Sequence, residues 1–387
     1  MISWPSCSAR GRALGALAAA SVLWGCAGAR PAPGRERMRL ALFPVENVSG
    51  VSVNTREVGT RLELELRRRG LDVVSGDIVE DFLARHRIRY TAGVDGETAR
   101  AAREELGVGG VLVSSVDLYR SRGTPQFGLS ARLVSAEDSP RILWMDGTER
   151  AGDDSLGLFG LGEVGSVIEL EDAALSRLAG SLSRFLQGTG PAVTRCTADG
   201  RFEPRVFYRA PLSRPGPRVS VAVLPFVNLT GHPAAGEVIA LAFVRELAAT
   251  DWIDVRDPGA VRSALLKHRI ILEGGVSHEA ARVSLGAMEV DVVISGRVHA
   301  FDGSPKVEFT ATALDTWTNR AVWQSSSFNR GDDGVFFFDA GRIGTAGELA
   351  CRMVREVGEE MVRHLAQGRS SPSRLPAPRS SPDVKGR

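Results

Sequence analysis

The fold is decided by a short stretch that the chain contains twice. Leu40-Ala-Leu-Phe-Pro-Val-Glu-Asn-Val-Ser-Gly50 has its match in Val221-Ala-Val-Leu-Pro-Phe-Val-Asn-Leu-Thr-Gly231. Each stretch opens with a nearly continuous apolar run, which is typical of a buried strand. Further motifs follow both stretches in the same order, so the chain is a duplicated unit and not a single irregular domain.

The later matches keep an offset of about 180 residues, with insertions of one or two. A period of this length is several times too long for a solenoid repeat. We therefore predict one copy over residues 38–187, a linker over 188–217, a second copy over 218–366 and a disordered tail over 367–387. The later matches are Arg85-His86-Arg87-Ile88 with Lys267-His268-Arg269-Ile270, Trp144 with Trp323, Gly152-Asp-Asp154 with Gly331-Asp-Asp333, and Phe159 with Phe338.

Each copy is predicted to run βαβααβββα, which makes the fold class α/β in the broad sense (α+β), with a mixed sheet and helices packed on it. Val58, Leu62 and Leu66 lie four residues apart, as on one face of a helix. Asp257 followed by Pro258 is typical of a helix start. The other expected elements are brief strands at 71–75 and 253–256, third helices at 96–106 and 277–286, a three-stranded meander, and last helices that start at Ser166 and Thr345.

Length and composition narrow the class of protein. The chain has 387 residues, 43% of them hydrophobic and 24% charged, which indicates a globular protein of two or three domains. It has 48 Lys and Arg against 46 Asp and Glu, so the net charge gives no reason to expect a nucleic-acid partner. The linker is rich in Gly, Pro and Arg, and 205–209 is its candidate for packing or an extra strand.

The amino-terminal segment is predicted to be an address and not part of the fold. Arg10 and Arg12 precede an apolar stretch that ends in Leu23-Trp-Gly-Cys26. That ending resembles the lipobox of bacterial lipoproteins, although the Trp is unusual there. The resemblance implies removal of residues 1–25, a lipid anchor with an N-acyl chain such as palmitate on Cys26, and a tether over 26–37. The alternative is an ordinary secretory signal with an incidental cysteine.

The anchor sets the expected location and reach. Ala27 follows the cysteine where an aspartate would favour the inner membrane in enteric bacteria, so we expect the outer membrane, with the protein facing the periplasm. About twelve tether residues span at most roughly 40 Å when extended. The first copy should therefore lie close to the membrane face, with partners in or near the same membrane.

The repeated strand, helix and meander pattern resembles the TolB amino-terminal-like and CsgG-like domains of bacterial envelope lipoproteins. The residues that carry the resemblance are Pro44, Asn47, Pro225, Asn228 and Ser295-Gly296. The sequence departs from the pattern at Gly109-Gly110, where the family has an acidic residue, and at Ser115, where it has glycine.

The resemblance implies a non-enzymatic assembly or interaction platform that is held to the membrane by its lipid. Its partners would be other envelope proteins or further copies of itself. Two alternatives stay open: a component of a CsgG-like secretion pore, and a ligand-binding protein that uses residues at the strand ends.

No residue pattern predicts catalysis, a cofactor or a metal. The sequence has no G-x-S-x-G, H-E-x-x-H, Walker loop or C-x-x-C motif, and none of its six histidines has a Cys or a second His at metal spacing. The glycines from Gly160 to Gly165 spell G-x-G-x-x-G, but they follow the meander instead of a first strand. We therefore interpret them as a loop.

Candidate partner-binding residues lie in two pairs of matched loops. Asn47 and Asn228 end the first strands, where an Asx turn is favoured over a ligand contact. The repeated aspartates favour a turn, with a partner-binding or membrane-facing loop as the alternative, because the apolar residues after them would otherwise be exposed. These candidates are Asp153, Asp154 and Phe159 in the first copy, and Asp332, Asp333 and Phe338 in the second.

Cys196 in the linker and Cys351 on the last helix remain after processing. Two independent thiols are favoured, and a disulfide that joins the linker to the second copy is the alternative.

Overall fold

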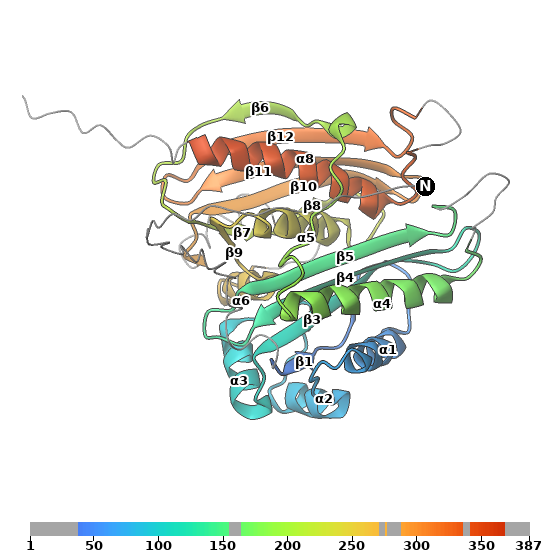
Figure 1. Ribbon diagram of the computed structural model, residues 1–387. Coiled ribbons are helices and arrows are strands. Elements are labelled where there is room, and N and C mark those ends of the chain that lie inside the picture. Colours follow the sequence, from blue (N-terminus) through green and yellow to red (C-terminus); the bar gives the residue numbers. More distant parts are fainter. Residues whose placement is uncertain (1–37, 155–163, 271–274, 277–287, 336–340, 368–387) are drawn as a thin grey trace, which may run out of the picture. The chain divides into compact units, whose positions relative to one another are not determined.

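The computed structural model describes residues 38–154, 164–270, 275–276, 288–335 and 341–367 (Figure 1). The predicted signal segment, the anchor at Cys26, the tether, most of the tail and the third helix of the second copy lie outside these residues. The described residues all belong to one compact unit. In the described part of the chain, no helix is both long enough and apolar enough to cross a membrane.

Most elements recur in the same order in both copies, and the described elements confirm the predicted mixed α/β class. The first copy consists of β1 (Leu40–Leu42), β2 (Glu46–Asn47), α1 (Thr55–Arg68), α2 (Gly76–Arg85), α3 (Gly96–Leu106), β3 (Gly110–Arg120), β4 (Gln126–Ser135), β5 (Ile142–Ala151) and α4 (Val167–Leu186). The second copy consists of β7 (Val219–Val223), β8 (Val227–Asn228), α5 (Ala235–Ala248), β9 (Ile253–Val255), α6 (Pro258–Lys267), β10 (Val292–Asp302), β11 (Lys306–Asp315), β12 (Arg320–Arg330) and α8 (Ala346–Gln367).

A proline breaks the first strand of each copy into two short strands. β1 and β2 lie on either side of Pro44, and both pair in parallel with β3. β7 and β8 flank Pro225 in the same way, and both pair in parallel with β10. Proline has no N–H to donate, so the ladder is interrupted where it stands. The chain is free to turn just after each break, which places Asn47 and Asn228 at the strand ends.

The meander strands complete the two sheets. The first sheet has the order β1-β3-β4-β5, and the second has the order β6-β12-β11-β10-β7-β9. β6 (Arg205–Arg209) is the candidate strand of the linker, and the structure confirms it as an antiparallel neighbour of β12. The strand predicted at 71–75 is wrong in extent, because only Val73 forms a bridge, to Leu40. Its counterpart β9 is a true strand.

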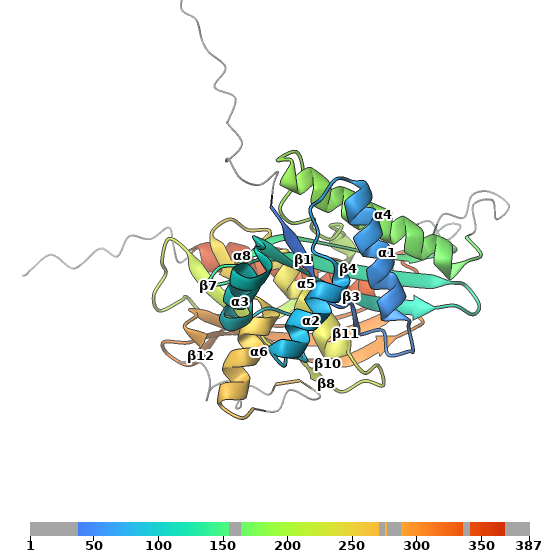
Figure 2. The ribbon, with the colours of Figure 1, turned by 90° about the horizontal axis from the view of Figure 1, so that it is seen from below.

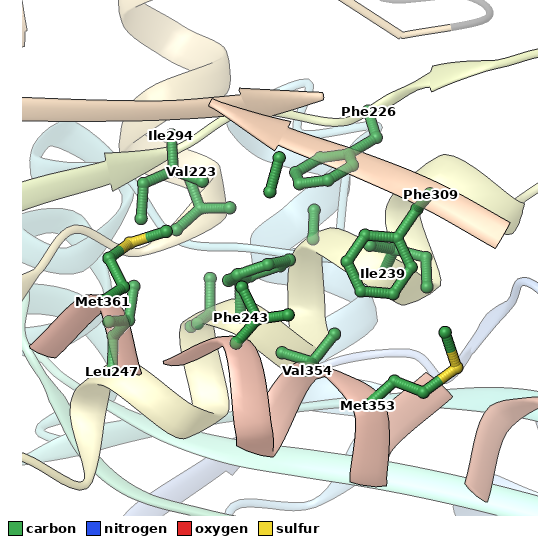
Figure 3. Packing of buried hydrophobic residues seen from close by; sticks show 14 of the residues in the cluster. Val223, Phe226, Ile239, Phe243, Leu247, Ile294, Phe309, Met353, Val354 and Met361 are labelled. Carbon is green, nitrogen blue, oxygen red and sulfur yellow. The ribbon is translucent and has the colours of Figure 1, made fainter. Parts of the chain in front are cut away.

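Helices cover the sheets according to the alternation of side chains along the strands. In the first copy, α1 and α4 lie side by side and bury one face of the sheet (Figure 2). α2 and α3 cover part of the opposite face. In the second copy, α5 and α8 bury one face and α6 covers part of the other. The core under α5 holds Phe226, Phe243 and Phe309, with ring centroids 5.4 and 6.0 Å apart in successive pairs (Figure 3).

The helix ends follow their sequence signals. Asp257 caps α6 and Pro258 occupies the first helical position, as predicted. Thr345 Oγ1 accepts the Glu348 N–H at 3.2 Å at the start of α8. Gly70 follows α1 with φ of +77°, a backbone conformation in which glycine is favoured at a helix end.

Candidate functional site

The two candidate asparagines are used inside their own loops. Asn47 Oδ1 accepts hydrogen bonds from the Ser49 N–H and hydroxyl, at 3.1 and 2.7 Å. Asn228 Oδ1 accepts the same two bonds from Thr230, at 3.0 and 2.8 Å. The predicted Asx turn is confirmed at both positions. Each carboxamide stabilises a turn, and its oxygen is already occupied by local donors.

The structure brings these two loops together. Gly50, in the first loop, has φ of +78°, and a Cβ there would lie 2.9 Å from Pro233 Cδ. Pro233 lies just after the second loop, where its carbonyl oxygen accepts a hydrogen bond from Asn228 at 3.2 Å. The duplicated loops therefore meet at the junction of the two copies.

The repeated aspartates form turns, as the sequence favours. Asp154 Oδ2 accepts the Ala151 N–H at 2.7 Å. Asp333 Oδ2 accepts the equivalent Arg330 N–H at 2.6 Å. The second aspartate of each pair thus holds the strand end that precedes it.

The two turns have different surroundings. A Cβ on Gly344 of the second copy would lie 2.9 Å from Asp154 Oδ1 and 3.9 Å from Asp153 Oδ1, so the first turn is at the junction. In the second turn, Asp332 is exposed and the Asp333 carbonyl oxygen accepts a hydrogen bond from Arg201 of the linker at 2.9 Å. Phe159 and Phe338 lie outside the described residues.

A buried ion pair joins the copies at the start of α6. Arg132 on β4 donates from Nε to Asp257 Oδ2 at 2.7 Å. Asp257 Oδ1 accepts the Val94 N–H of the first copy and the Gly259 N–H of its own helix, both at 2.8 Å. Asp257 is fully buried, and Arg132 is 5% exposed. One carboxylate therefore caps a helix of the second copy and binds the first copy at the same time.

The backbones of the two copies touch beside this ion pair. A Cβ on Gly93 would lie 2.4 Å from the Gly259 nitrogen, and a Cβ on Gly259 would lie 2.2 Å from the Val94 nitrogen. Real Cβ atoms do not approach backbone so closely, so only glycine fits at either position. The contact is a built junction and not a loose encounter of two surfaces.

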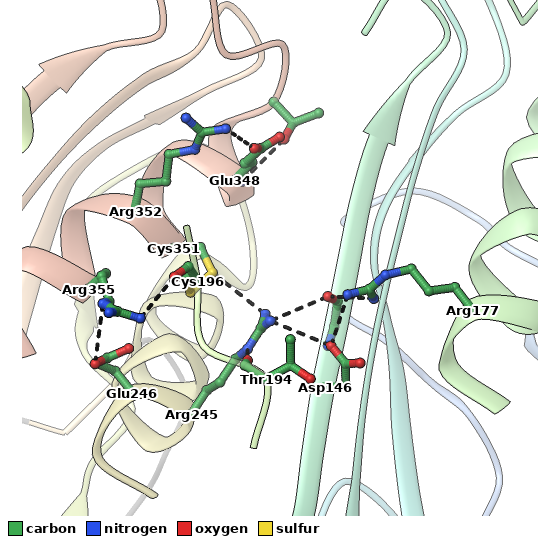
Figure 4. Close-up of a disulfide and its surroundings, with 12 residues drawn as sticks. Asp146, Arg177, Thr194, Cys196, Arg245, Glu246, Glu348, Cys351, Arg352 and Arg355 are labelled. Atoms are coloured by element: carbon green, nitrogen blue, oxygen red, sulfur yellow. Dashed lines mark hydrogen bonds and ion pairs between the residues drawn. A yellow bond between two sulfur atoms is a disulfide. The ribbon is translucent and has the colours of Figure 1, made fainter. Parts of the chain in front are cut away.

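A second charged cluster joins β5 to α5. Asp146 is buried on β5 and lies 3.3 Å from Arg177 of α4 and 3.6 Å from Arg245 of α5 (Figure 4). Arg245 Nε also donates to the Thr194 carbonyl oxygen of the linker at 2.5 Å. Burial lowers the pKa of the Arg245 guanidinium, and the Asp146 carboxylate opposes that shift. Arg245 thus contacts the first copy, the linker and its own copy.

The structure joins Cys196 and Cys351 in a disulfide, so the favoured interpretation of two separate thiols is wrong (Figure 4). The linker explains the pairing. The Met145 N–H on β5 donates to the Ala192 carbonyl oxygen at 2.9 Å, and the Met145 carbonyl oxygen accepts the Thr194 N–H at 3.0 Å. These bonds hold the linker along the edge of the first sheet. The linker then reaches α8, where the two Cα atoms lie 5.6 Å apart.

A polar cleft beside the disulfide holds two carboxyl groups with raised pKa values. Burial raises the pKa of Asp117 to about 6, against hydrogen bonds from Ser115 and Ser130 that lower it. Burial also raises the pKa of Glu149 to about 8, and the negative charge of Asp117 adds to that shift. Glu149 lies against the start of α8, where a Cβ on Gly347 would overlap it. We therefore expect protonation of Glu149 to act on the contact between β5 and α8.

A cavity of about 370 Å³ lies between the copies, behind the two asparagine loops. Its walls are β3 and β4 of the first copy and β7, α5 and α6 of the second. Glu46 and Glu237 lie at the cavity with Arg262, whose guanidinium is 4.4 Å from the centre of the Tyr90 ring. A cavity of this size, with apolar walls and a few polar groups, has the character of a small-molecule site.

The sequence did not predict these junction residues. Arg132, Asp146 and Arg245 belong to no motif, and Asp257 was predicted only as a helix cap. The available signal was the composition of α5, which has apolar residues on more than one side. A helix of this kind is expected to pack against more than one neighbour. Within the described residues, no group of three or more His, Cys, Asp or Glu could hold a metal.

No family model matches the chain, and no curated protein matches it. Solved structures do show similarity to parts of it. Lipoprotein GNA1162 from Neisseria meningitidis is 20% identical over 38% of this chain and 99% of that chain, with a TM-score of 0.28. The PelC dodecamer from Paraburkholderia phytofirmans is 16% identical over 40% and 94%, with a TM-score of 0.27. The LpoB C-terminal domain from Escherichia coli is 19% identical over 30% and 82%, with a TM-score of 0.24. At these values the likeness carries no argument about function.

Proposed function

We propose that this chain is a lipid-anchored, non-enzymatic protein of the bacterial envelope that serves as an assembly platform. The lipobox-like Leu23-Trp-Gly-Cys26 supports the anchor. Three connections between the copies support a single platform: the ion pair of Asp257, the cluster of Asp146 and the disulfide. We place the partner-binding surface on the second copy.

The observation that carries the proposal is the exposure of aromatic side chains on β6. β6 is the end strand of its sheet, and within the described residues it pairs with β12 alone. Phe207 and Tyr208 are 59% and 44% exposed there. Arg209 lies 5.3 Å over the Trp323 ring and binds Glu360 of α8, so the strand itself is held in place. Exposed aromatics on a fixed end strand are typical of a protein contact.

The partner that fits is an extended segment of another envelope protein, added as a strand beside β6. The first copy shows that the equivalent sheet edge accepts an added segment, because residues 192–194 of the linker lie along β5. In the second copy β6 is itself that added segment, and its outer edge is where a further strand would pair. The aromatic side chains would then contact the side chains of the partner.

Photo-cross-linking in cells tests this proposal. A photo-reactive amino acid in place of Phe207 or Tyr208 should give a discrete adduct with one membrane-associated protein. The matched control is the same amino acid in place of Leu64, which is equally apolar and 49% exposed on α1. Equal adducts from both surfaces, or none from β6, would overturn the proposed contact.

A further inference from the structure

The cavity between the copies is the feature that the platform function leaves unused. We propose that it is a binding site for a small amphipathic molecule with an apolar body and a protonated amine head. Nothing in the assembly role requires a space of about 370 Å³ at the junction. Interiors are otherwise close-packed, and a space of this size in a junction held so tightly would be filled by packing if it served only cohesion.

The body of the ligand is specified by the walls. Leu241 and Val244 of α5 and Val261 and Leu265 of α6 present aliphatic side chains to the cavity, and Val113 of β3 closes it from the first copy. All of these except Leu241 are buried. A ligand that replaces water against these side chains gains about 25 cal/mol for each Å² of apolar surface that it covers.

The corresponding positions in the first copy show that this wall is particular to α5. When Val58, Leu62 and Leu66 are aligned with the buried Ile239, Phe243 and Leu247, Leu241 pairs with Thr60 and Val244 pairs with Glu63. The first copy carries polar side chains where the second carries the apolar wall. The apolar lining is therefore not a general property of the duplicated fold.

The head of the ligand is specified by the charges at the cavity. Of the lining bases, Arg132 is already paired with Asp257. This leaves the carboxylates of Glu46 and Glu237 against the single guanidinium of Arg262. Burial raises the pKa of Glu237, the Arg262 guanidinium opposes that shift, and the negative charge of Glu46 adds to it, as expected for two carboxyl groups that face the same space. One uncompensated negative charge favours a cationic head over an anionic or neutral one.

The position of the head follows from exposure. Glu237, Pro233 and Asn47 are the exposed residues of the lining, whereas Ser115 and Arg132 are buried. The mouth therefore lies at Glu237, with the apolar walls behind it. The amine would sit at the mouth, next to Glu237 and Glu46, and the body would extend toward Leu265 of α6.

Calorimetric titration of the purified full-length protein with n-hexylamine, n-hexanol and hexanoate tests the proposal. Hexylamine should bind at least fivefold more tightly than the other two probes. Glu237→Gln should weaken hexylamine fivefold or more and leave hexanol unchanged, because it removes only the charge. Equal binding of the three probes, or no binding by hexylamine, would overturn the proposal.

Two further variants locate the site. Leu241→Trp should fill the cavity and abolish binding, whereas Thr60→Trp, at the matched position of α1, should leave it unchanged. Because Glu237 is exposed, its variant decides the matter even if Leu241→Trp disturbs the junction. An ethanolamine lipid shares the amine chemistry, so displacement of hexylamine by monomeric lysophosphatidylethanolamine would identify a lipid as the source. Hexylamine binding that survives both Glu237→Gln and Leu241→Trp would place the ligand elsewhere and overturn the assignment.

Discussion

Helices α1 and α5 occupy the same place in their copies, but they differ on the side that faces away from their own sheet. α1 is amphipathic, and its outer side carries Thr60 and the Glu63–Arg67 ion pair of 2.7 Å. α5 has Leu241 and Val244 at the positions that match Thr60 and Glu63, and it also contacts β5 of the first copy. The outer side of α1 faces solvent, whereas α5 contacts the sheet of the other copy. The two equivalent helices therefore have different roles.

The sheets show the complementary difference. On the face of β5 that meets α5, Gly147 lets Arg245 approach, and a Cβ there would lie 3.2 Å from the guanidinium. When Trp144 is aligned with Trp323, Ser326 of β12 is equivalent to Gly147, and Phe328 is equivalent to Glu149. Phe328 is exposed. The second sheet has a serine in place of the glycine that lets Arg245 approach, so this face of the second sheet differs from the docking face of the first.

The largest expected effect concerns the buried ion pair that only this arrangement of the copies contains. Arg132→Ala leaves the fully buried Asp257 without its cation and should lower the free energy of unfolding by about 3–5 kcal/mol. Urea unfolding measures this loss. The control, Arg141→Ala, removes an exposed partner of Glu137 and should cost no more than about 1 kcal/mol. Equal losses in both variants would contradict a buried ion pair between Arg132 and Asp257.

The disulfide is the next test, because it joins the linker, which lies along the first sheet, to α8 of the second copy. Replacing Cys196 and Cys351 together by Ser should lower the free energy of unfolding by about 2–4 kcal/mol. Wild-type protein unfolded in the presence of a reductant should match the double variant. If the reductant leaves the wild-type midpoint unchanged while free thiols appear, the bond does not hold the copies together.

A charge on the outer side of each helix tests the comparison directly. Leu241→Glu places a carboxylate in the apolar wall and should cost about 2 kcal/mol. Thr60→Glu makes the same charge on the exposed outer side of α1 and should change stability by less than about 0.5 kcal/mol. Matching midpoints for the two variants would show that α5 is as solvated as α1.

The sequence predicted what depends on neighbouring residues. The apolar runs, the prolines at 44 and 225, the Asp257 cap and the Asx turns are local signals, and the structure confirms them. The junction depends on residues far apart in the chain. Arg132 and Asp257 are 125 positions apart, and nothing beside either residue indicates the other. For the same reason the disulfide could only stay an alternative, because its geometry depends on where the linker lies.

The smallest effect is a pH dependence that only the docked face of the first sheet should show. The pKa of Glu149 is raised from 4.5 to about 8, so the folded protein favours its protonated form. Its contribution to stability is complete below about pH 4.5 and is lost as the pH rises through about 8. Asp117, with a pKa of about 6, adds a loss that is complete at lower pH.

Glu149→Gln should therefore remove the part of the decline in stability above about pH 6, measured as urea midpoints from pH 5 to 9. Glu104→Gln, on the exposed side of α3, should follow the wild type throughout. A Glu149→Gln protein that still loses stability between pH 6 and 8 would show that this carboxyl is ionised at the junction.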